Sequence, residues 1–208
     1  MNILEKKPSL VVLAGPSGSG KTTLARRIQG VYTGPIFLQD IDLGINYEGP
    51  ANQRSSGPKG SEEMNAAYKA MQMRTRALLN EGVNVLYVAT NRSIKAQEAV
   101  INLANECGAN LNAYQLDAGF GDLASRVRQR PPDHISGITT VTALESMLSD
   151  FHDFPGSRRI NTSKISVDAA ARLIIFEVWG PEHCQPDNLS SFIGFLRQKR
   201  AFQKQRTG

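Results

Sequence analysis

The segment GPSGSGKT at residues 15–22 constrains the fold of this chain more than any other feature, because it directly follows the apolar run of residues 10–14. The pattern G-x-x-x-x-G-K-[ST] is typical of a loop whose backbone N–H groups curl around a polyphosphate, and its glycines leave room for that ligand. Lys21 then reaches the β- and γ-phosphates, and Thr22 ligates Mg²⁺. The sequence therefore predicts a strand, a phosphate-binding loop and a helix, in that order.

We expect this loop to hold ATP together with Mg²⁺. The predicted cofactor-binding residues in it are Gly15, Ser17, Gly18, Ser19, Gly20, Lys21, Thr22 and Thr23. The following helix, from Lys21 to about Gln29 with Gly30 as its stop, points its positive dipole end at the same anion. A glycine-rich turn that binds no phosphate is the alternative, and the strand before and the helix after favour the phosphate loop.

Apolar runs alternate with helical patterns, which is typical of a parallel sheet covered by helices. We expect strands at residues 10–14, 36–39, 83–89, 111–116 and 158–161, and further helices at 61–80, 93–107, 140–151 and 167–178. The predicted fold is a three-layer α/β/α P-loop NTPase fold with a five-stranded parallel sheet and a helical lid. We expect one domain over residues 1–180, with the lid at about 122–152, followed by a basic C-terminal extension over 181–208.

Composition limits the class of protein. A chain of 208 residues with 40% hydrophobic content can bury one substantial core. It contains no stretch of roughly 18 to 20 apolar residues and no apolar signal core, so we expect a cytoplasmic protein without membrane contact. Residues 188–208 hold five Lys or Arg and no Asp or Glu, which accounts for the net charge of +5. This segment is either a nucleic-acid-binding tail or a solvated helix.

Two aspartates follow the second predicted strand. A carboxylate at this position faces the γ-phosphate, where it can orient an acceptor hydroxyl or hold Mg²⁺ through water. We interpret Asp40 as the general base and Asp42 as a metal ligand beside Thr22. Capping of a helix or turn is the alternative for each aspartate. The long loop at 44–60 is either substrate-facing or disordered in the absence of ligand.

Arginines and a polar turn complete the candidate site. Arg126 and Arg130 stand at i and i+4 and are expected to share one helix face, while Arg128 points elsewhere. Two guanidinium groups on one face suit the charge of a transferring phosphoryl group, although a solvated basic helix is the alternative. Asn161 and Thr162 follow the last strand and could line an adenine pocket, and helix N-capping explains this turn equally well.

Together these motifs resemble P-loop kinases of small molecules and of nucleic-acid ends, especially the kinase domain of polynucleotide kinase, with the zeta toxins as more distant relatives. The resemblance covers about residues 8–176 and rests on the segments 15–23, 88–92 and 161–163, on Asp40 and on the two arginines. It implies that Asp40 is the general base, that Arg126 and Arg130 are lid arginines, and that residues 161–163 belong to the nucleotide-base loop. The chain departs from the family at Val88, where the third strand typically carries an acidic residue.

Two functions follow as hypotheses. The first is an ATP-dependent phosphotransferase that moves the γ-phosphoryl group to a hydroxyl of a small molecule, a sugar nucleotide or a nucleic-acid 5′ end, with Lys21, Asp40, Arg126 and Arg130 as catalytic residues. The second is a catalytically weak, nucleotide-binding regulatory module whose basic tail engages nucleic acid or a protein partner. Val88 and the charge of the tail favour the second hypothesis, and Asp40 with the paired arginines favours the first.

Overall fold

The computed structural model describes residues 7–41, 61–130 and 138–185, and the side chains of residues 61–64 are left out of the description. In these residues five parallel strands form one sheet in the order β2-β3-β1-β4-β5. The strands are β1 (Ser9–Ala14), β2 (Ile36–Asp40), β3 (Asn84–Val88), β4 (Asn110–Asp117) and β5 (Arg158–Asn161). The predicted α/β fold with a five-stranded parallel sheet is confirmed.

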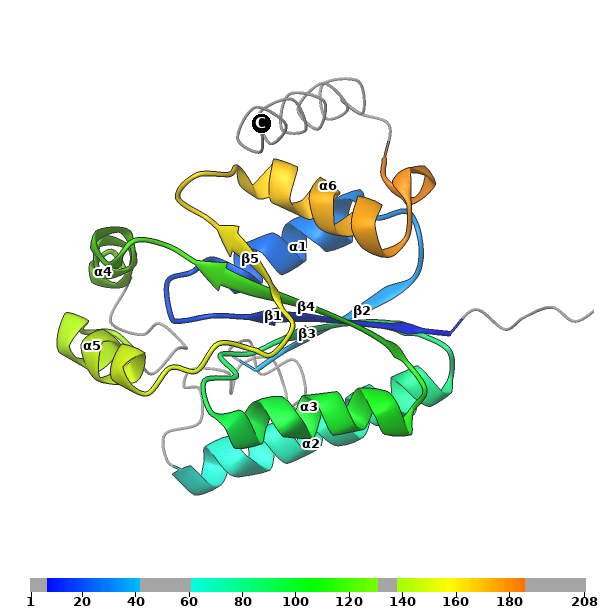
Figure 1. Ribbon diagram of the computed structural model, residues 1–208, viewed down its shortest axis with the longest axis horizontal. Helices are drawn as coiled ribbons and strands as arrows, with labels where there is room; N and C mark the ends of the chain where they lie inside the picture. Colours follow the sequence, from blue (N-terminus) through cyan, green and yellow to red (C-terminus); the bar gives the residue numbers. More distant parts are fainter. Residues whose placement is uncertain (1–6, 42–60, 131–137, 186–208) are drawn as a thin grey trace, which may run out of the picture.

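Helices cover both faces of this sheet, as Figure 1 shows. They are α1 (Lys21–Val31), α2 (Ser61–Asn80), α3 (Ile94–Glu106), α4 (Phe120–Arg128), α5 (Val141–Ser149) and α6 (Val167–Val178), and a short 3-10 helix, η2 (Pro181–His183), follows. Helices α1 and α6 lie on one face, α2 and α3 on the other, and α4 and α5 at one end of the sheet (Figure 1). None of the helices in the described residues is long and apolar enough to cross a membrane.

The central strand β1 explains why the sequence forms these layers. Val11 and Leu13 pack with α1 and α6, whereas Leu10 and Val12 pack with residues of α2 and α3. All four side chains are fully buried. A strand that is covered on both faces needs apolar residues at every position, and this requirement produces the continuous run seen in the sequence.

Helix boundaries follow local chemistry, and the end of α1 differs from the sequence prediction. Ser93, Thr140 and Ser166 cap α3, α5 and α6 by accepting hydrogen bonds from the backbone N–H three residues on. Gly30, in contrast, does not end α1, which continues to Val31. The two additional residues bring Val31 into the core on the α6 side of the sheet, and this packing outweighs the low helix propensity of glycine.

Residues 181–185 pack against the domain described above. The N–H of Gln185 donates to the carbonyl of Val31 at 2.9 Å, and the N–H of Thr33 donates to the carbonyl of His183 at 2.9 Å. Cys184 is buried beside these contacts. The remainder of the predicted basic extension lies outside the described residues.

Candidate phosphate- and nucleotide-binding site

The loop between β1 and α1 has the backbone that its glycines require. Gly15, Gly18 and Gly20 have φ angles of +146°, +85° and +89°, which side-chain-bearing residues rarely adopt. A Cβ atom on Gly15 would lie 2.4 Å from the carbonyl oxygen of Leu116, and one on Gly18 would lie 3.2 Å from that of Leu123. The loop is therefore fixed by backbone conformation and by close packing against β4 and α4.

Lys21 lies folded over this loop. Its side chain is 5% exposed, and Nζ donates to the carbonyl oxygens of Gly15 at 3.0 Å and Pro16 at 3.1 Å. The Oγ atom of Ser19 is buried and has no hydrogen-bond partner among the described residues. A buried hydroxyl without a partner typically costs about 1–3 kcal/mol. A glycine-lined loop with a lysine, an unsatisfied hydroxyl and the N-terminus of α1 fits a phosphate group.

A carboxylate reaches the threonine that follows the lysine. Thr22 Oγ1 donates a hydrogen bond of 2.7 Å to Asp40 Oδ2, and the Asp40 side chain is fully buried at the end of β2. The hydroxyl and the carboxylate are oxygen donors, which suit Mg²⁺. No cluster of three or more His, Cys, Asp or Glu side chains in the described residues could hold a metal ion, so phosphate oxygens and water would have to supply the other ligands. Asp42 lies outside the described residues.

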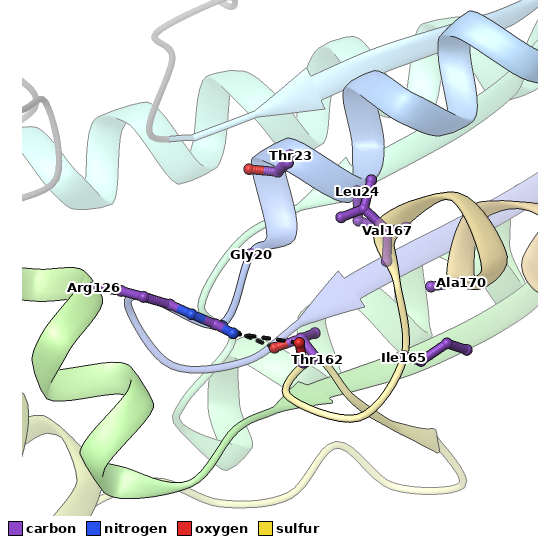
Figure 2. Close-up of a pocket in the computed structure, with 8 residues that line it drawn as sticks. All are labelled: Gly20, Thr23, Leu24, Arg126, Thr162, Ile165, Val167 and Ala170. Atoms are coloured by element: carbon purple, nitrogen blue, oxygen red, sulfur yellow. Dashed lines mark hydrogen bonds between the residues drawn. The ribbon is translucent and has the colours of Figure 1, made fainter.

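Beside the loop lies a cavity of about 230 Å³, shown in Figure 2. Its walls come from the first turn of α1, from α4, from the segment after β5 and from the start of α6. Its lining residues are Gly20, Thr23, Leu24, Arg126, Thr162, Ile165, Val167 and Ala170. Leu24, Ile165, Val167 and Ala170 are apolar, and Thr23, Arg126 and Thr162 add polar groups, as is usual for a pocket that binds a small molecule.

Arg126 joins the phosphate loop to the polar side of this cavity. Its guanidinium donates to the carbonyl of Gly18 at 3.0 Å and to Thr162 Oγ1 at 2.9 Å, and it reaches across toward Thr162 in Figure 2. Thr162 is held in turn by β4, because its N–H and its hydroxyl both donate to the carbonyl of Asp117. Asn161 does not line the cavity, and its side chain accepts a hydrogen bond from the N–H of Ser163.

Arg130 departs from the predicted geometry. Helix α4 ends at Arg128, so Arg130 lies beyond the helix and does not share a helical face with Arg126. Its guanidinium donates to the carbonyl of Ile138 at 2.8 Å. Arg130 directly precedes a proline, and the residue before a proline is disfavoured in helical conformation, which explains the early end. Arg128 is exposed, and residues 131–137 lie outside the described part of the chain.

The sequence analysis gave no functional role to two carboxamide side chains that lie buried at the same edge of the sheet. Gln39 precedes Asp40 on β2, and Asn91 follows β3. Both side chains are at most 1% exposed, and neither amide has a hydrogen-bond partner among the described residues. Asn91 also has a φ angle of +48°, and its carbonyl accepts a hydrogen bond of 2.8 Å from Gln97 Nε2. A strained residue with an open buried amide is a feature of functional sites, and the only signal for it in sequence is a polar residue just after a buried strand.

Comparisons with known proteins identify the family and the fold of this chain. The sequence matches the AAA domain family over residues 10–153, and no curated protein matches it. A sugar kinase from Janibacter sp. has a similar structure with a TM-score of 0.59 and 17% identity, covering 86% of this chain and 99% of that chain. An APS kinase from Mycobacterium tuberculosis, solved with AMPPNP and APS, has a TM-score of 0.56 and 17% identity, covering 81% and 96%.

A chain of the Pnkp1/Rnl/Hen1 RNA repair complex is also similar, with a TM-score of 0.57 and 22% identity over 74% of this chain and 49% of that chain. At identities this low, structural similarity shows a shared fold and no more. The match to the family covers residues 10–153, which include the phosphate loop, Asp40, Arg126 and Arg130. The chain belongs to the AAA domain family and has the fold of a P-loop kinase.

Proposed function

We propose that this protein is an ATP-dependent phosphotransferase that moves the γ-phosphoryl group to a hydroxyl of an acceptor. The observation that carries the proposal is the contact of 2.7 Å between Thr22 and the buried Asp40, at the mouth of a phosphate-binding loop. This contact brings a hydroxyl and a carboxylate to the side of the loop where the terminal phosphates of ATP are expected. Thr22 and Asp40 would hold Mg²⁺, which neutralises charge on the phosphates when bound.

Each of the other residues has a proposed role. The Lys21 ammonium exchanges its contacts with two loop carbonyls for the β- and γ-phosphate oxygens of ATP. Ser19 donates its free hydroxyl to the same anion. Arg126 lies between the phosphate loop and the cavity, where its guanidinium can bind phosphate oxygens of ATP. Thr162, which also lines the cavity, is proposed to border the base. Arg130 is proposed to approach the transferring phosphoryl group when the lid closes, because a guanidinium stabilises the charge that develops there.

The acceptor is proposed to lie over the carboxyl ends of β2 and β3, where ligands bind in open parallel sheets. Asn91 supports a hydroxyl-bearing acceptor, because a carboxamide both donates to and accepts from hydroxyl groups. The structural relatives include a protein named as a sugar kinase and one named as an APS kinase. A small molecule, a sugar nucleotide and a nucleic-acid 5′ end are the acceptor classes to test.

One observation favours a second candidate function. Val88, at the end of β3, is apolar and fully buried, so this strand brings no carboxylate to the phosphate loop. A protein of this kind could bind ATP and transfer little, serving as a regulatory module whose basic tail at residues 188–208 engages nucleic acid or a protein partner. Deletion of that tail should then weaken nucleic-acid binding and reduce its dependence on salt.

The experiment that separates the two functions uses γ-labelled ATP and a panel of acceptors: a neutral monosaccharide, a nucleoside, a sugar nucleotide and a 5′-hydroxyl oligonucleotide. We expect label on at least one acceptor with the wild type and loss of transfer with Asp40→Asn. Exposed Asp153, changed to Asn, is the matched control and should transfer label normally. Binding of ATP without label on any acceptor would favour the regulatory module.

A further inference from the structure

We propose that Gln39 and Tyr87 bind the acceptor through its neutral groups, and that the acceptor is an uncharged compound rich in hydroxyl groups, such as an unphosphorylated sugar. This inference rests on the proposed function, because it names the class of molecule that receives the phosphoryl group. It places the binding site on the face of the sheet that α2 covers, whereas α1, which follows the phosphate loop, lies on the other face (Figure 1).

Gln39 and Tyr87 are neighbours on adjacent strands. The parallel register pairs Gln39 of β2 with Tyr87 of β3, and Tyr87 packs in the core between the sheet and the helices α2 and α3. Because paired residues on adjacent strands point to the same face, the Gln39 side chain also lies on the α2 side. Asp40, the next residue, points to the opposite face, where it accepts the hydrogen bond from Thr22. The end of β2 thus carries a carboxylate on its ATP side and a carboxamide on its α2 side.

Both side chains are buried with hydrogen-bonding groups that the fold leaves unused. Gln39 and Tyr87 are 0% exposed, and neither polar atom of the Gln39 carboxamide has a partner among the described residues. The Tyr87 hydroxyl lies near Gln72 of α2 without a well-aligned hydrogen bond to it. Buried polar groups without partners destabilise a folded protein, so two of them side by side at a strand end point to a ligand.

The charges around this site indicate a neutral ligand. The buried charged residues in the described part of the chain are Lys21, Asp40 and Arg172, and all three belong to α1 or α6 or contact one of these helices. Burial raises the pKa of Tyr87 above its ordinary value of 10, so its hydroxyl stays protonated. An anionic group bound on the α2 face would lose its water without gaining a buried cation, which is costly.

The basic residues of α2 do not supply such a cation. Arg74 lies over the ring of Phe37 at 4.9 Å, and Arg76 pairs with Glu106 of α3. Lys69 is exposed. The basic side chains of this helix are therefore engaged with other residues or turned to solvent.

Hydroxyl groups match the chemistry of both side chains. The Gln39 carboxamide offers an acceptor oxygen and an NH₂ donor, and the Tyr87 hydroxyl can donate or accept. Strand β2 is the outer strand of the sheet, so the Gln39 side chain can turn toward a ligand without movement of another strand. An acceptor bound here would hold further hydroxyl groups on the α2 side while one hydroxyl faces Asp40 and the phosphates.

The test measures acceptor binding apart from transfer, with AMPPNP as the bound nucleotide. Saturation-transfer difference NMR gives the affinity of four neutral compounds: glucose, ribose, inositol and uridine. We expect at least one of them to bind. UDP-glucose and a 5′-hydroxyl oligonucleotide, which are anionic, should not displace it.

Two variants remove the proposed contacts and keep the side-chain volume. Gln39→Met should weaken binding of the neutral compound about tenfold and Tyr87→Phe about threefold, as expected for lost hydrogen bonds, with unchanged affinity for AMPPNP. Without acceptor, the urea midpoint of each variant should equal or exceed that of the wild type, because a buried polar group without a partner is removed. Thr75→Val is the matched control: it removes another such hydroxyl further along α2 and should bind the neutral compound normally.

Four results would overturn the inference: no binding of any neutral compound, its displacement by an anionic one, wild-type affinity in Gln39→Met, or a lower urea midpoint in that variant. Gln39-dependent binding of a neutral compound without label transfer from ATP to any acceptor would leave the inference standing and refute the proposed function instead. Label transfer to anionic acceptors alone, with wild-type KM in Gln39→Met, would do the reverse.

Discussion

The two ends of the sheet both bury polar side chains, but they satisfy them differently. At the amino end, near η2, the guanidinium of Arg172 is 3% exposed and donates to Asp168, to Cys184 Sγ and to the carbonyl of Gln185. Trp179, which ends α6, is an exception, since its Nε1 has no partner among the described residues. At the carboxyl end, the Ser19 hydroxyl and the amides of Gln39 and Asn91 are left open.

This difference teaches which buried polar groups serve the fold. A closed network such as that of Arg172 is complete without a ligand and holds η2 on α6 and α1. Open groups destabilise the folded protein unless something else binds them. Three of the residues with open groups, Ser19, Gln39 and Asn91, lie beside the phosphate loop and the ends of β2 and β3, where a nucleotide and its acceptor are proposed, whereas Thr75 on α2 and Trp179 after α6 lie elsewhere. Variants at the open end should therefore change binding and transfer, and variants at the closed end should change stability.

The largest expected effect is at the open end. Lys21→Ala should weaken ATP binding or transfer by about 100-fold or more, because it removes the charged donor of the phosphate cradle. The free energy of unfolding should change little, since the fold keeps its core and the lysine ammonium donates to carbonyls of the phosphate loop. Calorimetric titration with ATP measures the binding, and Lys95→Ala on the exposed face of α3 is the control. Unchanged ATP affinity in Lys21→Ala would contradict the site assignment.

The next effect is at the closed end. Arg172→Met should lower the free energy of unfolding by about 2 kcal/mol, because it removes charge-assisted hydrogen bonds and leaves the carbonyl of Gln185 without a donor. Its ATP affinity should equal that of the wild type. Denaturant unfolding and calorimetry together test both halves of this statement. If Arg172→Met lost ATP affinity and kept the wild-type free energy of unfolding, the proposed difference between the two ends of the sheet would be wrong.

Asn91→Gly tests the open amide with a smaller effect. Glycine tolerates the φ angle of +48°, so the backbone should keep its course and the free energy of unfolding should stay within about 1 kcal/mol of the wild type. Transfer to the acceptor should fall about tenfold, which corresponds to one lost hydrogen bond. Steady-state measurement should show the change in the KM of the acceptor. Wild-type transfer in Asn91→Gly would argue against an acceptor contact.

The smallest effect concerns pH and the closed end. Partial burial raises the pKa of Asp168, but hydrogen bonds from Arg27 and Arg172 outweigh it and hold the pKa below its ordinary value of 3.8. Because the pKa is lower in the folded protein, the ionised carboxylate contributes its full stabilisation at pH values above the ordinary pKa of 3.8. This contribution disappears as the pH falls through the lowered pKa of the folded state. The difference in Tm between wild type and Asp168→Asn should be constant above about pH 5 and shrink in stronger acid. A difference in Tm that stays constant down to strong acid would show that ionisation of Asp168 is not its cause.

Local patterns in the sequence were enough for much of this structure. The spacing of glycines and Lys21 predicts the phosphate loop, because its conformation depends on neighbours in the chain. The alternation of apolar runs with helical patterns predicts the layers for the same reason. The proximity of Asp40 to the phosphate loop could be predicted, since the carboxyl ends of parallel strands meet at one edge of the sheet. Its hydrogen bond to Thr22 could not.

Features that depend on tertiary contacts were beyond such patterns. The i, i+4 spacing of the arginines suggested one helix face, but the proline after Arg130 ends α4 early and turns that side chain to Ile138. The reach of Arg126 to both Gly18 and Thr162 depends on how α4 packs against the loop. Asn91 looks like an ordinary loop residue in the sequence, but the folded chain buries its side chain, and Gln97 donates to its carbonyl across the turn.

The central claim is that the site at the carboxyl end of the sheet transfers the γ-phosphoryl group of ATP to an acceptor hydroxyl. Phosphorus NMR of the protein with ATP, Mg²⁺ and the acceptor panel follows the γ-phosphate directly. The account predicts a new phosphomonoester resonance that grows as ADP forms and is absent with Lys21→Ala. ATP that stays intact, or that yields inorganic phosphate alone, would contradict it.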